Sequence, residues 1–471
     1  MEIFHLSAEC FPVAKVGGLA DVVGALPKYQ KNLGHEACVI MPGYNTKFVR
    51  DNKFSEVYSG EIKLDVFTFN YKILREETDV LGFNLYIVDI PELFARPEIY
   101  SYDDDTERFL AFQIAFLNWI TETNRKPDIV HCHDHHTGLI PFMMRFCYVY
   151  DNLSNTPTIL TIHNGQYQGW FGFEKINYIP EFNKLKIGFL EWNQTINPLA
   201  TAIKCAWKVT TVSPSYLEEI TYNANGLEDL LKHERNKSVG ILNGIDTEVW
   251  NPKTDVMLHK NYTFNDFSEG KLSNKKQLCK DFNLSESLPL FTFIGRLVGE
   301  KGADLLPEVV EIALQKFSGK LNILLLGSGE KLIENQLQNL QEKFKNNYNL
   351  YIGYNEKLAH QVYAAADFLL MPSRVEPCGL NQMYSLRYGT IPIVRRTGGL
   401  KDTVIDIGDN GFGICHDQTS VEDIIYSISR AIELYQNQEK FSEIQKTAMQ
   451  LDHSWNSAAK KYTDVYQTLI H

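Results

Sequence analysis

The chain has 471 residues, which exceeds the usual size of a single hydrophobic core and predicts two domains. Its hydrophobic (44%) and charged (22%) fractions are those of an ordinary globular protein. The formal net charge of −12 argues against a nucleic-acid partner, because proteins that bind nucleic acids usually present a basic face. An anionic substrate would therefore require a local group of Arg and Lys side chains within a negative field.

The cysteines and the first residues favour a cytoplasmic protein. Met1 leads directly into IFHLSAE, without the basic and apolar regions of a signal peptide. No window approaches the roughly 18 consecutive apolar residues of a membrane span. The eight cysteines are scattered and include no CxxC pair, which fits a reducing compartment better than a disulfide framework.

The first predicted strand, Glu2 to Ser7, leads into a glycine turn and a helix. The Gly17-Gly18 pair permits a tight turn, and apolar residues then follow helical spacing across Pro27. Such a turn presents backbone N–H groups and the positive end of the helix dipole, which suit a phosphate or a sugar oxygen. A helix start that serves packing alone is the alternative, and without a GxGxxG pattern a dinucleotide site is only weakly indicated.

The rest of the first half alternates strands and helices, with antiparallel hairpin material at Lys53 to Glu77. The acidic run Asp103 to Asp105 resembles a metal-binding DxD, but it directly precedes a predicted helix, Arg108 to Ile120, and an acidic helix N-terminus explains it better. Further strands are predicted at Ala37 to Met41, Leu85 to Ile90, Asp128 to Cys132, Thr158 to His163, Val209 to Ser213 and Val239 to Asn243.

Two of these strands end in histidine-containing motifs. HCHDHHTGL has four histidines in six positions, yet no further ligand stands at the offsets of a usual zinc site. We therefore prefer a strand-to-helix corner at which Asp134 and the histidines hydrogen-bond a sugar. His163 and Asn164 end the next strand beside aromatic residues, a combination suited to carbohydrate, with a core histidine as the alternative.

The second half repeats the α/β pattern after a polar, irregular stretch from Trp250 to Leu288 with two short helical pieces. Helices separate the strands, which predicts parallel βαβ units, and the closing segment, Val421 to His471, is predicted to be helical throughout. Two doubly wound domains facing one another would leave a cleft between them. The strands are predicted at Leu290 to Ile294, Asn322 to Leu326, Asn349 to Ile352, Asp367 to Met371 and Ile391 to Val394.

The loops after these strands carry charged residues suited to a nucleotide sugar. Arg296 and Lys301 follow the first strand and could both reach a diphosphate, although either alone could form a surface ion pair with Glu300. Glu376 lies in the segment MPSRVEPCGLNQMYSLRYGTIPIVRRTGGL, where a carboxylate could bind sugar hydroxyls or stabilise an oxocarbenium-like centre. Its structural alternatives are pairing with Arg374 or capping the helix that follows.

These motifs, in this order, resemble those of bacterial glycogen synthases and plant starch synthases, from Ser7 to Trp455. The resemblance implies a GT-B fold of two Rossmann-like domains around a deep cleft. It also implies a retaining, metal-independent glucosyltransferase that needs no cofactor and extends the non-reducing end of an α-1,4-glucan such as glycogen. The donor is expected to be ADP-glucose, with UDP-glucose as the alternative. The motifs are KVGGLADVVGALP, HCHDHHTGL, TIHNGQYQG, TTVSPSY, LNGIDTEVWNP, GRLVGEKG, PSRVEPCGL and TGGLKDTV.

The resemblance also implies roles for individual residues. On the donor side, Arg296 and Lys301 would neutralise the leaving diphosphate and Glu376 would hold the glucose, while His163 would lie at the reacting carbon. The remaining expected contacts are Lys15 and Gly18 to the donor diphosphate and sugar, the backbone of Cys378, Gly379 and Leu380 to the glucose, Thr397 and Gly398 to phosphate oxygens, Tyr354 to the base, and Asp134, Asn164 and Asn243 to the sugar. Residues 1–248 would form the acceptor-side domain, 249–455 the nucleotide-sugar domain, and 456–471 a helix that returns to the first domain.

Two residues depart from the family pattern: Val16 stands where Thr is frequent in bacterial relatives, and His135 where Trp is common. A backbone contact survives the first change, whereas the second alters packing on the acceptor side. Because no carboxylate can be assigned as a covalent nucleophile, we expect a front-face displacement. A zinc hydrolase built on HCHDHH and a non-catalytic glucan-binding protein are the alternatives from other functional classes.

Overall fold

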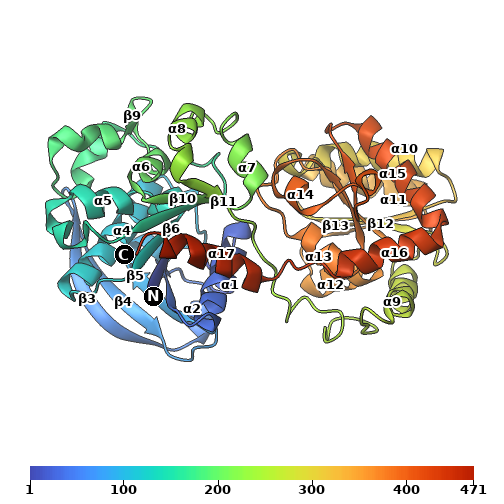
Figure 1. The fold of residues 1–471 in the computed structure, drawn as a ribbon, viewed down its shortest axis with the longest axis horizontal. Coiled ribbons are helices and arrows are strands. Elements are labelled where there is room, and N and C mark those ends of the chain that lie inside the picture. The colour runs from blue at the N-terminus through green and yellow to red at the C-terminus, as the bar shows by residue number, and fades with distance from the viewer. Residues whose placement is uncertain (471) are drawn as a thin grey trace. The chain divides into compact units, whose positions relative to one another are not determined.

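The computed structural model describes residues 1–470, which form two compact α/β units. Unit 1 comprises Met1–Asn243 together with the C-terminal segment from Trp455, and unit 2 comprises Gly244–Ser454 (Figure 1). The boundaries expected from the sequence lie close by, after residues 248 and 455. The observed positions follow from pairing, because the Ile245 N–H donates to the His453 carbonyl at 2.8 Å and ties both connecting segments to unit 2.

Unit 1 is organised around a sheet of nine strands in the order β11-β10-β7-β6-β1-β2-β5-β4-β3. Only β3 and β4 are antiparallel to their neighbours, and they form the predicted hairpin. The first strand is central, with β2 on one side and β6 on the other, so a topological switch point lies between β1 and β6. The bounds are β1 (Glu2–Leu6), β2 (Glu36–Pro42), β3 (Phe54–Leu64), β4 (Phe67–Glu76), β5 (Asn84–Asp89), β6 (Ile129–His133), β7 (Thr158–Ile162), β10 (Lys208–Thr211) and β11 (Ser238–Gly240).

The helices of unit 1 include one that continues through proline and one with an acidic first turn. Pro27 lies inside α1, and Asp105 opens α4, where it pairs with Arg108 while Asp104 pairs with Arg96. The acidic run is thus explained by the helix start, as predicted. The helices are α1 (Gly18–Asn32), α2 (Lys47–Asp51), α3 (Pro91–Phe94), α4 (Asp105–Glu122), α5 (Ile140–Phe146), α6 (Pro198–Cys205), α7 (Pro214–Glu219), α8 (Glu228–His233) and α17 (Trp455–Gln467), and a small hairpin joins β8 (Glu191–Trp192) to β9 (Thr195–Ile196).

Unit 2 contains a fully parallel six-stranded sheet in the order β14-β13-β12-β15-β16-β17. This is the doubly wound order, with its switch point between β12 and β15. The five predicted strands are present, and the short β17 was missed. The strands are β12 (Leu290–Ile294), β13 (Asn322–Gly327), β14 (Tyr348–Ile352), β15 (Phe368–Met371), β16 (Ile391–Arg395) and β17 (Ile414–His416); the helices are α9 (Phe267–Asp281), α10 (Leu306–Lys316), α11 (Lys331–Lys343), α12 (Glu356–Ala365), α13 (Asn381–Arg387), α14 (Gly398–Thr403), α15 (Val421–Gln436) and α16 (Gln438–Met449).

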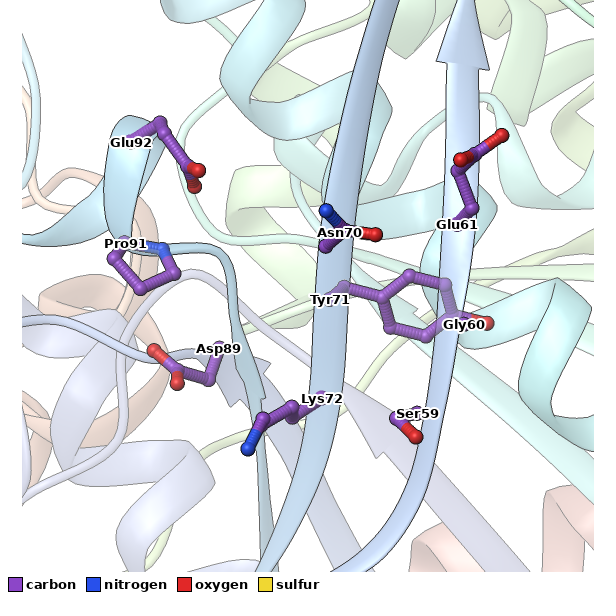
Figure 2. Close-up of a pocket in the computed structure, with 9 residues that line it drawn as sticks. All are labelled: Ser59, Gly60, Glu61, Asn70, Tyr71, Lys72, Asp89, Pro91 and Glu92. Atoms are coloured by element: carbon purple, nitrogen blue, oxygen red, sulfur yellow. The ribbon is translucent and has the colours of Figure 1, made fainter.

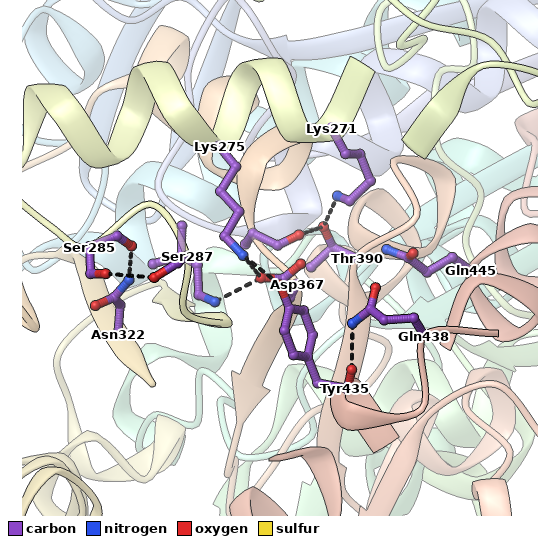
Figure 3. Close-up of polar contacts among 12 residues, drawn as sticks. Lys271, Lys275, Ser285, Ser287, Asn322, Asp367, Thr390, Tyr435, Gln438 and Gln445 are labelled. Atoms are coloured by element: carbon purple, nitrogen blue, oxygen red, sulfur yellow. Dashed lines mark hydrogen bonds and ion pairs between the residues drawn. The ribbon is translucent and has the colours of Figure 1, made fainter. Parts of the chain in front are cut away.

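Helix α9 lies in the stretch that the sequence predicts to be irregular, and the prediction of two short pieces was wrong there. Its buried positions include Lys271, Asn274 and Lys275, so the apolar periodicity that marks a helix is weak. Lys275 Nζ lies 2.6 Å from Asp367 Oδ2, and Lys271 Nζ lies 2.8 Å from Thr390 Oγ1 (Figure 3). Polar contacts to the sheet therefore hold this helix together with its buried apolar residues Phe267, Leu278 and Cys279.

The closing segment is not helical throughout. It consists of α15, α16 and α17, with residues 451–454 outside any helix and Ser454 in a parallel bridge with Ile245. Beyond that bridge, α17 packs beside α1 in unit 1 (Figure 1), where Trp455 and Tyr466 are buried in one cluster with Ile3 and Val22. Among the helices of residues 1–470, none is long and apolar enough to cross a membrane.

Candidate active site

In unit 1, the residues singled out from the sequence all follow parallel strands of one sheet. Lys15 and Gly18 follow β1, Asp134 follows β6, His163 follows β7 with Asn164 next to it, and Asn243 follows β11. Because the carboxyl ends of parallel strands share one edge, these residues lie on the edge where open α/β sheets bind ligands.

Asp134 holds the backbone of the neighbouring strand end. Its Oδ1 accepts hydrogen bonds from the His163 N–H at 2.7 Å and the Asn164 N–H at 3.4 Å. Its φ of 56° is unusual for a residue with a side chain and is typical of functional loops. Burial raises the pKa of the Asp134 carboxyl to about 7, although the two backbone hydrogen bonds act in the opposite direction.

The glycine turn after β1 differs from the sequence-based picture of open N–H groups. The Val16 and Gly17 N–H groups donate to Glu9 Oε2 at 2.5 and 2.9 Å, and the Tyr100 hydroxyl donates to Glu9 Oε1 at 2.7 Å. An internal carboxylate therefore occupies these two donors. Nothing lies within 4 Å of a Cβ added at Gly18, so close packing does not explain the glycine there.

Lys15, expected to contact the donor, is partly exposed in the same loop. Its Nζ lies 2.7 Å from Asp21 Oδ1 in the first turn of α1, and 40% of its side chain is exposed. An exposed pair of this kind contributes little to stability and can exchange partners. The ammonium is therefore available to a ligand at low energetic cost.

The histidines of the β6 motif form a buried cluster with His5 of β1. Nitrogens of His5, His131 and His133 lie within 4.8 Å of one another, an arrangement that could hold a metal ion. Each of these rings, however, uses both nitrogens in hydrogen bonds to protein groups, and His133 Nδ1 lies 3.0 Å from His163 Nε2. These hydrogen bonds account for the burial of the cluster by themselves.

Asn243 and His135 are among the residues of unit 1 with a buried polar atom that lacks a hydrogen-bond partner within residues 1–470. Asn243 is 7% exposed, and its Oδ1 has no hydrogen-bond partner within residues 1–470, so it remains available as an acceptor. His135, the departure from the family pattern, has its ring centroid 3.7 Å from that of His136, and burial lowers its pKa to about 4. His135 is therefore a neutral, packed residue.

In unit 2, the two main candidate side chains meet at the switch point. Lys301 follows β12, Glu376 follows the adjacent β15, and Lys301 Nζ lies 2.7 and 2.8 Å from the two Glu376 oxygens. Ser373 Oγ donates to Glu376 Oε2 at 2.9 Å. Only 7% of Glu376 is exposed, so a nearly buried carboxylate is held by an ammonium and a hydroxyl.

Glu376 neither pairs with Arg374 nor caps the helix that follows, the two structural alternatives for this residue. Arg374 pairs with Asp304 and donates to the Gly299 carbonyl, and α13 begins without a side-chain cap. Arg296, in contrast, lies 3.6 Å from Glu300 with 62% of its side chain exposed. The surface ion pair considered for either cation is therefore observed for Arg296 only, and it is a weak one.

The second glycine turn packs directly on the loop that carries Glu376. Gly398 has a φ of 44°, and a Cβ there would overlap the Glu376 carbonyl oxygen, while one at Gly399 would overlap that of Cys378. The Gly399 N–H also donates to the Glu376 carbonyl at 3.1 Å. Close backbone approach is thus a structural reason for these glycines, in addition to any ligand contact.

The remaining donor-side candidates of unit 2 lie at the same sheet edge. Cys378 is buried, Gly379 and Leu380 lead into α13, and Thr397 precedes α14 after β16. Tyr354 follows β14 and is 79% exposed. The loops after β12, β14, β15 and β16 therefore carry all the unit 2 candidates, as the strand order requires.

A separate hollow lies on the antiparallel side of unit 1, across β3, β4, the end of β5 and the start of α3 (Figure 2). It carries charges of both signs and none of the candidate residues, so we do not assign it to the site. Its lining consists of Ser59, Gly60, Glu61, Asn70, Tyr71, Lys72, Asp89, Pro91 and Glu92.

Comparison with known proteins agrees with this geometry. Residues 2–233 match the starch synthase catalytic domain, and residues 274–448 match the glycosyl transferases group 1 domain. The catalytic domain of starch synthase IV from Arabidopsis thaliana, bound to ADP and acarbose, superimposes with a TM-score of 0.89 at 33% identity over 100% of this chain and 99% of that one. The fold and site thus define a GT-B glycosyltransferase with two Rossmann-like domains.

Relatives found by sequence identify the family within this class of glycosyltransferases. A glycogen synthase from Flavobacterium johnsoniae is 59% identical over 100% of this chain and 99% of that protein. A glycogen synthase from Geobacillus thermodenitrificans is 37% identical over 100% and 98%, respectively. The chain belongs to the glycogen and starch synthase family, and it is a glucosyltransferase that uses a nucleotide sugar.

Proposed function

We propose that the chain transfers glucose from ADP-glucose to the non-reducing end of an α-1,4-glucan with retention of configuration. The observation that carries the proposal is the Lys301–Glu376 pair at the switch point of unit 2, with Ser373 at hydrogen-bond distance. ADP as the nucleotide is supported by the starch synthase IV structure, which contains ADP and acarbose.

On the donor side, Lys301 contacts the diphosphate and Glu376 contacts the glucose. The ammonium has three N–H donors, so it can keep one Glu376 oxygen and give another donor to the diphosphate. Arg296, exposed on the same loop, supplies a second cation as negative charge develops on the leaving group. Glu376 then uses its released oxygen to accept hydrogen bonds from glucose hydroxyls.

The other donor contacts come from backbone groups and from Tyr354. In the proposal, the backbone of Cys378, Gly379 and Leu380 lies along the glucose, and the backbone N–H groups of Thr397 and Gly398 donate to phosphate oxygens. The exposed ring of Tyr354 stacks on the base.

Unit 1 contributes the groups around the reacting carbon and the acceptor. His163 lies beside the reacting carbon with Asn164 next to it, while Asp134 and Asn243 offer oxygens to sugar hydroxyls. Lys15 and Gly18 reach the donor diphosphate and sugar. The unsatisfied Oδ1 of Asn243 supports such a role, because buried polar groups in native proteins usually have a partner.

The transfer proceeds by front-face displacement without a metal ion. The bond from the anomeric carbon to the diphosphate oxygen breaks, the bond to the acceptor hydroxyl oxygen forms on the same face, and the hydroxyl proton passes to the departing diphosphate. The product linkage is then α, and a β linkage in the NMR spectrum of the extended glucan would contradict the mechanism. The eight buried cysteine thiols support the expectation that this reaction takes place in a reducing, cytoplasmic environment.

The testing experiment measures nucleotide diphosphate release from ADP-glucose and from UDP-glucose, each with and without glycogen. Glycogen-dependent release from ADP-glucose is expected. Preference for UDP-glucose would support the same reaction with UDP-glucose as the donor. Release from neither donor, with glycogen still bound, would favour a non-catalytic glucan-binding protein.

A further inference from the structure

A line of buried polar side chains connects the last helix of unit 1 to His163. Gln30 Nε2 donates to the Tyr466 hydroxyl at 3.0 Å, and Gln30 Oε1 lies 2.7 Å from His5 Nε2. His5 Nδ1 lies 3.1 Å from His133 Nε2, and His133 Nδ1 lies 3.0 Å from His163 Nε2. The first four side chains are at most 1% exposed, and His163 is 8% exposed.

The amide of Gln30 sets the direction of every hydrogen bond in this line. Its oxygen can only accept, so His5 Nε2 carries a proton. Burial lowers the pKa of His5 to about 4 and that of His133 well below its usual value, so both rings are neutral near pH 7. A neutral ring with one protonated nitrogen accepts with the other, so His133 Nε2 donates to His5 and His163 Nε2 donates to His133.

A second branch keeps the Gln30 amide in its observed orientation. The Tyr466 hydroxyl accepts from that amide and donates to His131 Nδ1 at 2.7 Å. His131 Nε2 then donates to Thr161 Oγ1 and Thr161 to Thr210, each at 2.6 Å, and Thr210 donates to the Leu160 carbonyl at 3.4 Å. Because a carbonyl can only accept, this end of the branch favours one direction for the whole network.

We propose that Gln30, His5 and His133 are positioning residues that hold His163 with its proton on Nε2 and a lone pair on Nδ1. His163 Nδ1 has no hydrogen-bond partner among the described residues, so it is the nitrogen left for a ligand. A lone pair on Nδ1 accepts a hydrogen bond from a sugar hydroxyl. The opposite tautomer would instead present an N–H group, a donor, to that hydroxyl. This inference rests on the proposed role of His163 in glucosyl transfer.

The first test reads the tautomer without using activity. The full-length protein is labelled with ¹⁵N-histidine, and the His163 signals are assigned by their loss in His163→Ala. Without donor or glucan, we expect a protonated Nε2 and an unprotonated Nδ1. Gln30→Met removes the acceptor of His5 at nearly constant volume, and we expect it to shift His163 to a mixture of tautomers.

The second test asks whether the tautomer affects the reaction. Gln30→Met is expected to lower kcat about tenfold, because His163 no longer keeps a single tautomer. A loss of this size is expected when an orienting hydrogen bond is removed. The donor KM should stay within about twofold, because the Nδ1 contact to the sugar hydroxyl is expected to strengthen mainly in the transition state. Gln30→Glu should restore kcat and the tautomer, because a buried, protonated glutamic acid offers the same acceptor to His5 and a donor to Tyr466.

A matched pair of variants controls for the general effect of removing a buried hydroxyl. Tyr466→Phe removes the partner that orients the amide and should mix the His163 tautomers. Tyr150→Phe removes an equally buried hydroxyl that donates to Asn118 at 2.7 Å, outside the network, and should leave both the spectrum and kcat unchanged.

Three outcomes would overturn the inference: a proton on His163 Nδ1 in the unaltered protein, an unchanged His163 spectrum in Gln30→Met, or a mixed spectrum with unchanged kcat. If no donor is used by a protein that shows the expected tautomer, the proposed glucosyl transfer fails while the hydrogen-bond network stands. The two failures are therefore distinguishable.

Discussion

Lys301 and Glu376 lie 75 residues apart in the chain, yet Lys301 Nζ lies within 2.8 Å of both carboxylate oxygens. The sequence identified both residues as candidates but assigned one to phosphate and the other to sugar. Their direct contact makes each the electrostatic partner of the other, because a nearly buried carboxylate without a cation is unfavourable.

Lys301→Ala is expected to lower kcat by roughly 10² to 10³, as the loss of one transition-state donor does. Glu376→Ala is expected to be nearly inactive while remaining folded. Steady-state kinetics with ADP-glucose and glycogen measure both effects. The control is Lys343→Ala, which removes an exposed pair with Glu311 at the end of α11 and should leave kcat unchanged. A fall of less than about tenfold in Lys301→Ala would remove Lys301 from the reaction.

The pKa of Asp134 gives a pH-dependent prediction at the same scale. Burial raises the pKa of this carboxyl to about 7 from its usual 3.8. Its stabilising contribution is therefore fully present below pH 3.8 and is lost as pH rises through 7, by about 1.4 kcal/mol for each pH unit. Asp134→Asn keeps a side-chain oxygen that accepts from the His163 N–H and removes the carboxyl group that titrates.

The measurement compares the free energy of unfolding of unit 1 in the two proteins at several pH values. The difference, unaltered protein minus Asp134→Asn, should fall as pH rises from about 4 to about 7. A difference that does not change with pH would show that Asp134 is ionised throughout this range.

At the scale of single elements, α9 is attached to the sheet of unit 2 by buried lysines as well as by the apolar residues Phe267, Leu278 and Cys279. Lys275 Nζ lies 2.6 Å from Asp367 Oδ2 (Figure 3). The same oxygen accepts a hydrogen bond from the Leu290 N–H at 2.8 Å. Because lysines and an asparagine occupy part of the buried face of α9, its apolar periodicity is weak, and the sequence pattern did not reveal the helix.

Lys275→Met is expected to destabilise unit 2 by about 3 to 5 kcal/mol, because it leaves the Asp367 carboxylate buried without its cation. The double variant with Asp367→Asn should lose less than the sum of the two single changes, because the charge is removed together with its partner. Urea unfolding of the four proteins measures the coupling. Additive effects would contradict a direct interaction between the two side chains.

The turn at Gly399 is a second element whose role depends on tertiary contact. A Cβ at this position would overlap the Cys378 carbonyl, so Gly399→Ala must displace the loop that carries Glu376. We expect a loss of stability of about 1 to 3 kcal/mol, together with a fall in kcat of up to about 10², since small displacements of catalytic groups have large effects.

The control for Gly399→Ala is Gly188→Ala, because nothing lies within 4 Å of the added Cβ at Gly188. Thermal unfolding and kcat are measured for both variants. If Gly399→Ala had the stability and kcat of the unaltered protein, the loop would tolerate the displacement and the contact would be irrelevant to the site.

At the scale of the whole molecule, the chain enters unit 2 at Gly244 and returns to unit 1 at Trp455. The folding of unit 1 therefore requires residues from both ends of the chain. Trp455 is 3% exposed and packs in one cluster with residues of β1 and α1.

Trp455→Ala is expected to destabilise unit 1 by about 3 to 5 kcal/mol, as other large-to-small changes in a core do. Differential scanning calorimetry should show a lower transition temperature for unit 1 and an unchanged one for unit 2. Tyr426→Ala, at a tyrosine that is 66% exposed on α15, is the control and should change neither. A shift of the unit 2 transition alone would contradict the assignment of α17 to unit 1.

Local patterns in the sequence were sufficient for the α/β class, for most strands and for the loops that carry candidate residues. Strand and helix periodicity depend on residues a few positions apart, and parallel strand order places loop residues at one sheet edge. The family motifs, read in order, were sufficient for the class of reaction.

Contacts between distant residues required the tertiary structure. The contacts of Tyr100 with Glu9, of Gln30 with Tyr466, of Lys301 with Glu376 and of Lys275 with Asp367 leave no periodic signal, because each joins residues far apart in the chain. Local propensity cannot encode which of several polar side chains a buried carboxylate or histidine meets. Only packing brings such partners together, and the cost of leaving them unpaired then fixes the arrangement.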